Sequence, residues 1–140
     1  MSSITLTYKT DIPNANGHIY PKEVFKAALE EYWNANKPIL GGVGQEPSAE
    51  FPLKDTSHVI RKENVKEVDD GFVITATILP TPRGFVLLSL LAEDKQIYKF
   101  AIRGIGNISE DHKIKDLKIV SIDIIPDETV VFDEKENELY

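Results

Sequence analysis

A tight turn between two strand-like runs is the feature that most constrains the fold of this chain. The turn is Asp69-Asp70-Gly71; Thr56–Val68 precedes it, and Phe72–Leu79, which is rich in Val, Ile and Thr, follows it. Asp-Gly between β-branched and aromatic runs favours a hairpin, because glycine tolerates the positive φ values that a tight turn requires. The sequence therefore predicts a β-hairpin and antiparallel strand pairing.

Further strands and two helices flank this hairpin. Strands are expected at Ile4–Tyr8, Ile97–Ile105 and Leu117–Ile125, with a possible short strand near Ile39. Alternating or continuous apolar runs of this length are typical of half-buried and buried strands.

The two helices are predicted from their first residues and their spacing. One begins at Pro21 and extends to about Asn36, with apolar residues recurring every three or four positions. The other begins at Thr81-Pro82, where threonine caps the helix and proline takes the first helical position. Its segment 85–92 is apolar nearly all round, so we expect that helix to be buried.

The predicted order β, α, β, β, α, β, β indicates an α+β fold. We expect a small antiparallel β-barrel or a strongly curved sheet, with two helices packed on it. The 140-residue chain is long enough for one domain with its own core. We assign residues 1–133 to that domain and residues 134–140 to an acidic C-terminal tail or edge extension.

Charge and composition exclude several classes of protein. A net charge of −7 argues against a nucleic-acid-binding protein, because little positive charge is present to neutralise phosphates. The apolar run Phe85–Ala92 is far shorter than the roughly 20 residues that a membrane span needs. The N-terminus lacks the pattern of a secretory signal, and the chain has no cysteine. We therefore expect a soluble, cytoplasmic protein, or part of an assembly built in the cytoplasm, that binds neither nucleic acid nor a membrane.

His58 is the strongest candidate for a catalytic base among the three histidines. It lies within the apolar run Ser57-His58-Val59-Ile60, where strand alternation would place Ser57 on the opposite face. A lone histidine on a strand is more often a structural residue than a catalyst. The histidine spacing gives no metal site, and Gly104-Ile105-Gly106 lacks the third glycine of a dinucleotide fingerprint. The sequence thus predicts no metal and no cofactor.

Two charged residues lie in apolar strands. Arg103 stands between an apolar run and two glycines, a position suited to holding an anion or a developing oxyanion. Asp123 lies within Ser121–Ile125, so it either faces solvent or has a partner, since an unpaired buried carboxylate is costly. A paired Asp123 could orient a histidine.

Short motifs follow one another along the chain: NGHIYP from Asn16, SHVI from Ser57, LPTPRG from Leu79, AIRGIG from Ala101 and SIDIIP from Ser121. In this order they resemble the N-G-R-x-Y-P, S-H-x-I, x-x-T-P-x-G and S-x-R-G-x-G segments and the closing strand of the prohead core proteases of tailed bacteriophages. That family consists of capsid maturation serine proteases of the herpesvirus-assemblin type. The resemblance extends over most of the chain, from Asn16 to Pro126.

The resemblance implies a small β-barrel with surrounding helices and a serine protease that works inside an assembling capsid. His58 would be the base, Asp123 or a second histidine would orient it, and Arg103 with the Gly104 amide would face the oxyanion. The nucleophilic serine, however, maps to Ala101, and the neighbouring Ile102 is equally inert.

Other positions also bear on the resemblance. Gly44-Gln45-Glu46-Pro47 stands where the family more often has G-H-P. Ser57 and Ser109 are the nearest alternative hydroxyls. We expect His58 and Ala101 to line one cleft, since a base must lie close to the nucleophile position.

Three functions fit these observations. The first is a catalytically inactive protein of this fold that serves as a structural or auxiliary component of a phage head. The second is a genuine maturation protease, cleaving scaffold and capsid proteins, whose serine has been changed to Ala101. The third is an unrelated α+β binding domain. The first two imply capsid or scaffold proteins as partners, a possible oligomer on the capsid, and a location in the host cytoplasm during assembly and then in the virion head.

Overall fold

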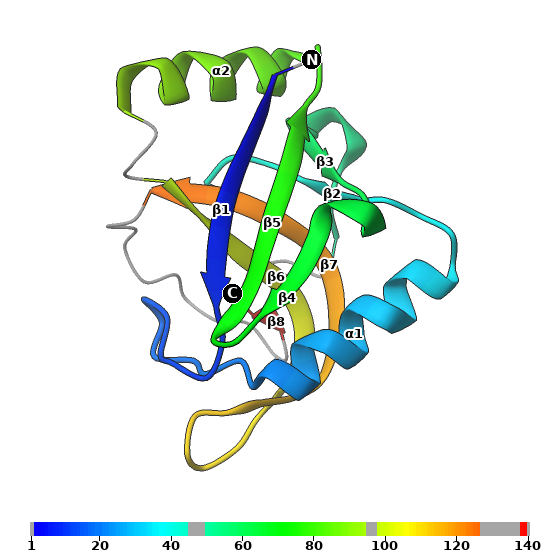
Figure 1. The fold of residues 1–140 in the computed structure, drawn as a ribbon, viewed down its shortest axis with the longest axis vertical. Coiled ribbons are helices and arrows are strands. Elements are labelled where there is room, and N and C mark those ends of the chain that lie inside the picture. The colour runs from blue at the N-terminus through cyan, green and yellow to red at the C-terminus, as the bar shows by residue number, and fades with distance from the viewer. Residues whose placement is uncertain (1, 45–49, 95–97, 127–137, 140) are drawn as a thin grey trace.

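The computed structural model describes residues 2–44, 50–94, 98–126 and 138–139 (Figure 1). The strands are β1 (Ser3–Lys9), β2 (Ile39–Gly41), β3 (His58–Ile60), β4 (Val65–Val68), β5 (Gly71–Ile78), β6 (Tyr98–Ile108), β7 (Ile114–Pro126) and β8 (Glu138–Leu139). The helices are α1 (Lys22–Asn34) and α2 (Pro82–Asp94), with short 3₁₀ turns η1 (Leu53–Asp55) and η2 (Lys62–Asn64). The α+β class and the short strand near Ile39 are confirmed. The single strand expected over Thr56–Val68 is wrong, because η2 divides that segment into β3 and β4.

The first sheet is built around β5. Its strand order is β1-β5-β3-β2, with β4 also paired to β5, and all of these pairs are antiparallel. The predicted hairpin is β4–β5, which closes at the pair Val68 and Gly71. Alternate residues of β5 point into the core: Phe72, Ile74, Ala76 and Ile78 are all buried. The period-2 pattern of the sequence thus sets which face of this sheet is covered.

The second sheet contains β6 and β7, paired antiparallel, with β8 on the other edge of β6. Helix α1 packs against β7 and also reaches the first sheet, where Phe25 meets the Phe72 ring edge-on at 5.0 Å between centroids. The buried side chains of α1 are Phe25, Ala28 and Leu29, which form one helical stripe. Apolar burial between the two sheets and α1 is the main stabilising contribution to the fold.

The two sheets meet where the chain after β2 runs beside β7. The Ile124 amide donates to the Gly42 carbonyl at 2.9 Å, and the Gly44 amide donates to the Ile124 carbonyl at 3.0 Å. This junction joins the sheets without closing them into a barrel. Of the two architectures expected from the sequence, the strongly curved sheet with packed helices is therefore the observed one.

Helix α2 differs from its prediction. Its cap is as expected, with the Gly84 amide donating to Thr81 Oγ1 at 2.9 Å. The helix, however, lies across one end of the sheets rather than within the core (Figure 1). Phe85 is 59% exposed and Val86 is 45% exposed, whereas Leu87 is fully buried. The expectation that segment 85–92 would be buried is wrong, because only one side of α2 contacts the body of the protein.

The C-terminal residues include an edge strand. Gly104 and Ile105 of β6 pair with Leu139 and Glu138, and the Leu139 side chain is buried. Of the range assigned to an acidic tail, residues 134–137 and 140 lie outside the described residues. Among the helices that the structure describes, neither is long and apolar enough to cross a bilayer.

Candidate functional site

The candidate site is organised by strand alternation in β6 and β7. Phe100 and Ile102 of β6 belong to the main core, so the alternate residues Ala101 and Arg103 point to the other face of this sheet. Asp123 of β7 lies directly across from Ala101 in the strand register. The β6–β7 pairing therefore brings Ala101, Arg103 and Asp123 together on one face.

Arg103 and Asp123 form a buried ion pair. Arg103 Nε and Nη2 donate to Asp123 Oδ2 at 3.0 and 2.8 Å, and the two residues are 1% and 0% exposed. Asp123 Oδ1 accepts from the Gly42 amide at 3.0 Å and from Ser121 Oγ at 2.9 Å. Both carboxylate oxygens therefore have donors, as a buried charge requires.

The guanidinium of Arg103 has further contacts beyond the carboxylate. Nη1 donates to the Glu50 carbonyl at 3.2 Å, and the guanidinium carbon lies 5.3 Å from the centre of the Phe51 ring. Of the two environments expected for Asp123, solvent or a partner, the structure shows a partner. That partner is an arginine, so both charges are used within the fold.

His58 is fully buried, and both of its ring nitrogens have partners. Nε2 lies 2.7 Å from the Ile122 carbonyl, and Nδ1 lies 2.7 Å from Ser57 Oγ. A carbonyl oxygen can only accept, so Nε2 carries the proton and donates to Ile122. Burial lowers the pKa of His58, and this effect exceeds the opposing effects of the Ile122 hydrogen bond and the Asp123 charge. In the neutral ring Nδ1 is an acceptor. The single Ser57 hydroxyl proton has two acceptors within reach, Nδ1 at 2.7 Å and the Gly41 carbonyl at 3.2 Å, and the shorter contact favours donation to Nδ1.

The contact between Ser57 and His58 was not predicted. Alternation would place their side chains on opposite faces, but β3 begins at His58 and Ser57 precedes it. The Ser57 amide instead donates to the Gly41 carbonyl at 2.9 Å, and its hydroxyl turns toward the imidazole. The expectation that Ser57 points away from His58 is therefore wrong.

Gly41 allows His58 to reach β7. A Cβ at this position would lie 1.9 Å from the Ile122 carbonyl oxygen and 2.2 Å from His58 Nε2. Any side chain there would occupy the space of the hydrogen bond between His58 and Ile122. Glycine at position 41 therefore permits the close approach of β2 to β7.

The remaining candidate positions have structural environments. Gly104 lies within β6, where a Cβ would meet the Lys118 carbonyl at 2.8 Å, so close strand packing accounts for this glycine. Ser109 lies in a turn, and its hydroxyl donates to the Asp111 carboxylate. Of the Gly44–Pro47 departure, residues 45–47 lie outside the described residues.

Ala101 and His58 both have Asp123 nearby but differ in their other contacts. Ala101 is 9% exposed and groups with Ile125, whereas the His58 ring lies 6.5 Å from the Phe100 ring between centroids. The prediction that His58 and Ala101 line one cleft stays a prediction. In the part of the chain that the structure describes, no cluster of His, Asp and Glu could hold a metal ion.

Comparisons with known proteins add a structural relative. No family model and no curated protein matches the chain. Among solved structures, the chain matches that of the bacteriophage T4 capsid assembly protease, gp21, with a TM-score of 0.72 and 20% sequence identity. The match covers 88% of this chain and 80% of the protease chain.

The chain has a prohead-protease-like fold. The resemblance inferred from the sequence motifs is thereby supported at the level of the fold. At 20% identity the match carries no residue roles, so the chemistry must be argued from the site itself.

Proposed function

We propose that this protein is a catalytically inactive member of the prohead-protease fold that serves as a structural or auxiliary component of a phage head. It would act in the host cytoplasm during assembly and then in the virion head, in contact with capsid or scaffold proteins. The fold shared with a capsid assembly protease supports the setting, and the chemistry of three positions supports the inactivity.

The position that corresponds to the nucleophile carries a methyl group. Covalent peptide cleavage requires a hydroxyl or thiol that attacks the carbonyl carbon, and Ala101 has neither. The next residue, Ile102, is part of the main core. Ser57 has the hydroxyl that contacts the imidazole, but Ser57 is fully buried, so a peptide substrate cannot reach it.

The hydrogen bonds of His58 carry the proposal. A general base needs an unshared electron pair directed at the proton that it removes. Nε2 donates its proton to the Ile122 carbonyl, and Nδ1 accepts from Ser57, so neither nitrogen of the neutral ring is available. We infer that His58 occupies the base position of an ancestral protease and now serves to join β3 to β7.

The oxyanion positions are also occupied by structural contacts. The Arg103 guanidinium donates to Asp123 and Glu50, and Gly104 is paired within β6. A role for Arg103 in holding an oxyanion would require the buried ion pair to open, which is costly. Asp123, a possible orienting acid, instead holds Arg103 and the Gly42 amide.

The alternative is a genuine maturation protease whose serine has been replaced by Ala101. One observation favours it: Ala101 lies across from Asp123 and two residues from Arg103, an arrangement of charges that a lost serine would leave intact. In this alternative a restored hydroxyl would recover cleavage of scaffold and capsid proteins.

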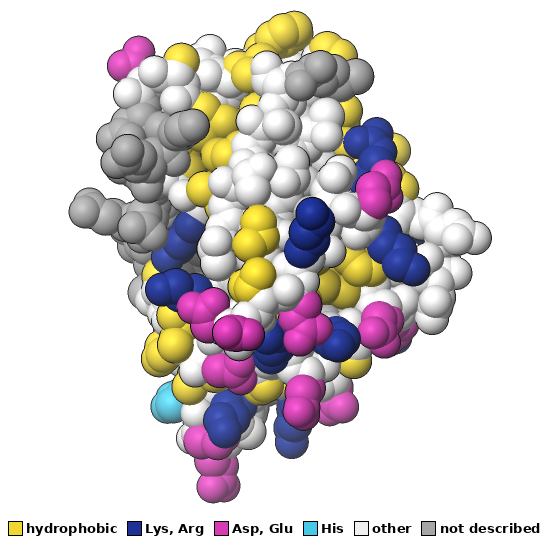
Figure 2. All heavy atoms as spheres, in the orientation of Figure 1, with side chains coloured by type: hydrophobic (Ala, Val, Ile, Leu, Met, Phe, Trp, Pro, Cys, Tyr) yellow, Lys and Arg dark blue, Asp and Glu magenta, His cyan; other side chains and the backbone are white. Residues whose placement is uncertain are grey.

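The surface available for a head protein is the exposed face of α2. Figure 2 shows hydrophobic side chains gathered at the end of the molecule where α2 lies, while acidic and basic side chains gather toward the other end. Phe85, Val86 and the nearby η1 residue Leu53 are the large exposed apolar residues of this region. Exposed apolar residues of this kind favour contact with another protein.

Restoring serine at position 101 tests the proposal. Ala101→Ser is incubated with capsid and scaffold proteins, and Ala101→Ser combined with His58→Ala serves as the control. We expect no cleavage by either variant, and co-sedimentation of the unchanged protein with assembled heads. Cleavage by Ala101→Ser that disappears in the double variant would establish the protease alternative, and absence from heads would contradict the auxiliary role.

A further inference from the structure

The end of α1 and the segment after β3 enclose a cleft that is separate from the Ala101 site. Its volume is about 240 Å³, and Trp33 and Lys62 also line a second hollow of about 430 Å³. Asn36, with φ 56°, turns the chain out of α1 beside this cleft. Asparagine adopts this left-handed conformation more readily than most residues, so the turn is built into the sequence.

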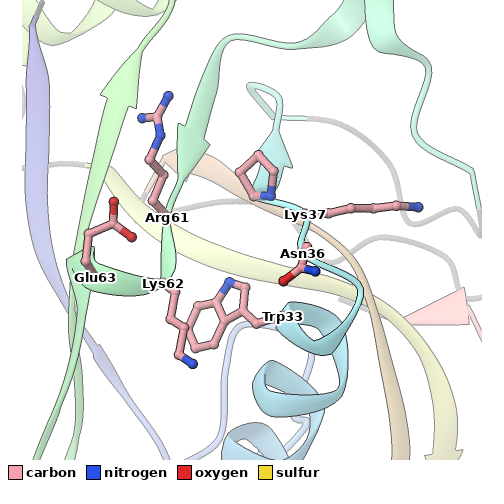
Figure 3. A pocket seen from close by; sticks show the side chains of 7 residues that line it. Trp33, Asn36, Lys37, Arg61, Lys62 and Glu63 are labelled. Atoms are coloured by element: carbon pink, nitrogen blue, oxygen red, sulfur yellow. The ribbon is translucent and has the colours of Figure 1, made fainter.

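Trp33 lines the cleft and has an unused hydrogen-bond donor. Its Nε1 atom is buried and has no hydrogen-bond partner within the residues that the structure describes. Figure 3 shows this nitrogen on the edge of the ring that faces the space between Arg61 and Asn36. A buried indole N–H without an acceptor is costly, and native structures seldom leave one unpaired. An acceptor supplied by a ligand would remove this cost.

The cleft is also bordered by unpaired cations. Lys37, Arg61 and Lys62 line it together with one acidic residue, Glu63. Within the described part of the chain no ion pair involves these three cations, although Lys22 and Lys26 pair with Glu67 and Arg83 pairs with Asp55. On a chain of net charge −7, this cluster is a local excess of positive charge. It favours a negatively charged partner.

The surroundings of the indole add apolar surface. Pro38 lines the same cleft. The adjoining hollow has an apolar part, Leu29, Val65 and Phe72, and a charged part, Lys26, Glu30 and Glu67. An apolar floor with cations on its rim suits a ligand that carries both carboxylates and an apolar side chain. The whole chain is acidic, so a long polyphosphate backbone would be repelled outside this small region.

We propose that the Trp33 cleft binds an acidic peptide segment of a partner protein. A carboxylate of the peptide lies near Arg61 and Lys62 and accepts the Nε1–H of Trp33 once the side chains that cover this nitrogen shift, while an apolar side chain of the peptide packs on the indole or in the adjoining hollow. This site is distinct from the Ala101 region, and the inference holds whether or not the protein is a component of a phage head.

Intrinsic fluorescence tests the proposal directly, because Trp33 is the only tryptophan in the chain. The full chain is titrated with an acetylated, amidated hexapeptide of Asp and Glu around a central Leu, and with a matched peptide in which Asn and Gln replace the acids. We expect a saturating change in emission with the acidic peptide that weakens as salt is raised. At least about tenfold weaker binding is expected for the neutral peptide.

Charge-reversal variants distinguish binding in the cleft from attraction between the peptide and positive charge elsewhere on the protein. Lys62→Glu and Arg61→Glu should each weaken binding of the acidic peptide by at least about tenfold. Lys54→Glu makes the same charge change on the exposed η1 turn outside the cleft and should leave binding within about twofold. Trp33→Phe, followed by calorimetry, keeps the ring but removes the donor, and should also weaken binding.

Several results would overturn the proposal. Equal binding of the acidic and neutral peptides would exclude carboxylate recognition, and equal weakening by Lys54→Glu would exclude the cleft. Tighter binding of inorganic phosphate or of a single-stranded oligonucleotide than of the acidic peptide would exclude a peptide as the ligand. No change in emission and no heat of binding with the acidic peptide would exclude the site.

Discussion

The Arg103 guanidinium and the Asp123 carboxylate lie 2.8 Å apart in a fully buried ion pair on the face of β6 and β7 that also carries Ala101. The pair holds the Gly42 and Glu50 backbone as well, through Asp123 Oδ1 and Arg103 Nη1. The two charged side chains therefore hold the chain segment that follows β2 against the second sheet.

Breaking this pair from one side should be strongly destabilising. Asp123→Asn removes the negative charge and leaves the Arg103 guanidinium buried without a counter-ion, which costs about 3–5 kcal/mol. Urea unfolding followed by circular dichroism measures this loss. The double variant Arg103→Met with Asp123→Leu removes both charges and should recover most of it. A loss below about 1 kcal/mol for Asp123→Asn would show that the pair is not a fixed part of the fold.

Gly41→Ala should be among the most damaging small substitutions in the chain. The added methyl would lie 1.9 Å from the Ile122 carbonyl oxygen, which belongs to the backbone of β7 and cannot move aside cheaply. We expect a loss of more than about 3 kcal/mol in unfolding free energy, or a failure to fold.

Gly17→Ala is the matched control for that substitution. Gly17 has φ 79° but open space around its Cα, so an alanine there suffers backbone strain of about 1–2 kcal/mol and no clash. If Gly41→Ala cost no more than Gly17→Ala, the close contact between β2 and β7 would have to be wrong.

Stability should fall as pH drops below the ordinary pKa of histidine. Burial lowers the pKa of His58 in the folded protein, so the unfolded chain, with a histidine pKa near 6.5, binds a proton more readily than the folded one. The stabilisation is therefore complete above about pH 6.5 and is lost progressively as pH falls toward the folded pKa. Urea unfolding at pH values from about 7.5 to 5.5 measures this slope.

The pH effect is assigned to His58 by substitution. His58→Gln keeps an amide donor for the Ile122 carbonyl but cannot titrate, so its unfolding free energy should vary less over that range. His112→Asn alters an exposed histidine at φ 64°, a conformation that asparagine tolerates, and should keep the slope of the unchanged protein. An unaltered slope in His58→Gln would assign the effect to another group.

Local patterns predicted the elements of this fold well. The Asp69–Gly71 turn and the alternation of β5 identified the hairpin, and Thr81 with Pro82 identified the start of α2. Closure of the sheets and the burial of α2 were harder to predict. Both depend on which surfaces pack against each other in the folded protein. The apolar sequence of a helix does not predict how many of its faces another element will bury.

The contacts within the candidate site were harder to predict from the sequence than the secondary structure. The motifs placed Ala101, Arg103 and Asp123 on neighbouring strands, and the register brings them together. Sequence spacing did not reveal that Arg103 would be the partner of Asp123, because the pair joins residues 20 positions apart. Nor did it reveal the Ser57–His58 contact, which depends on β3 starting at His58 and not at Thr56 as the sequence predicted.

The exposed face of α2 should matter for association and little for stability. Phe85→Ser removes a side chain that is 59% exposed, and serine and phenylalanine have similar helix propensities, so the unfolding free energy should change by only about 0.5 kcal/mol. Leu87→Ala, two residues further along the same helix, empties a fully buried position and should cost about 2–5 kcal/mol. Co-sedimentation with phage heads should then be weakened by Phe85→Ser while its thermal unfolding stays unchanged. Undiminished association of Phe85→Ser with heads, or a loss of stability in this variant, would contradict a contact surface on α2.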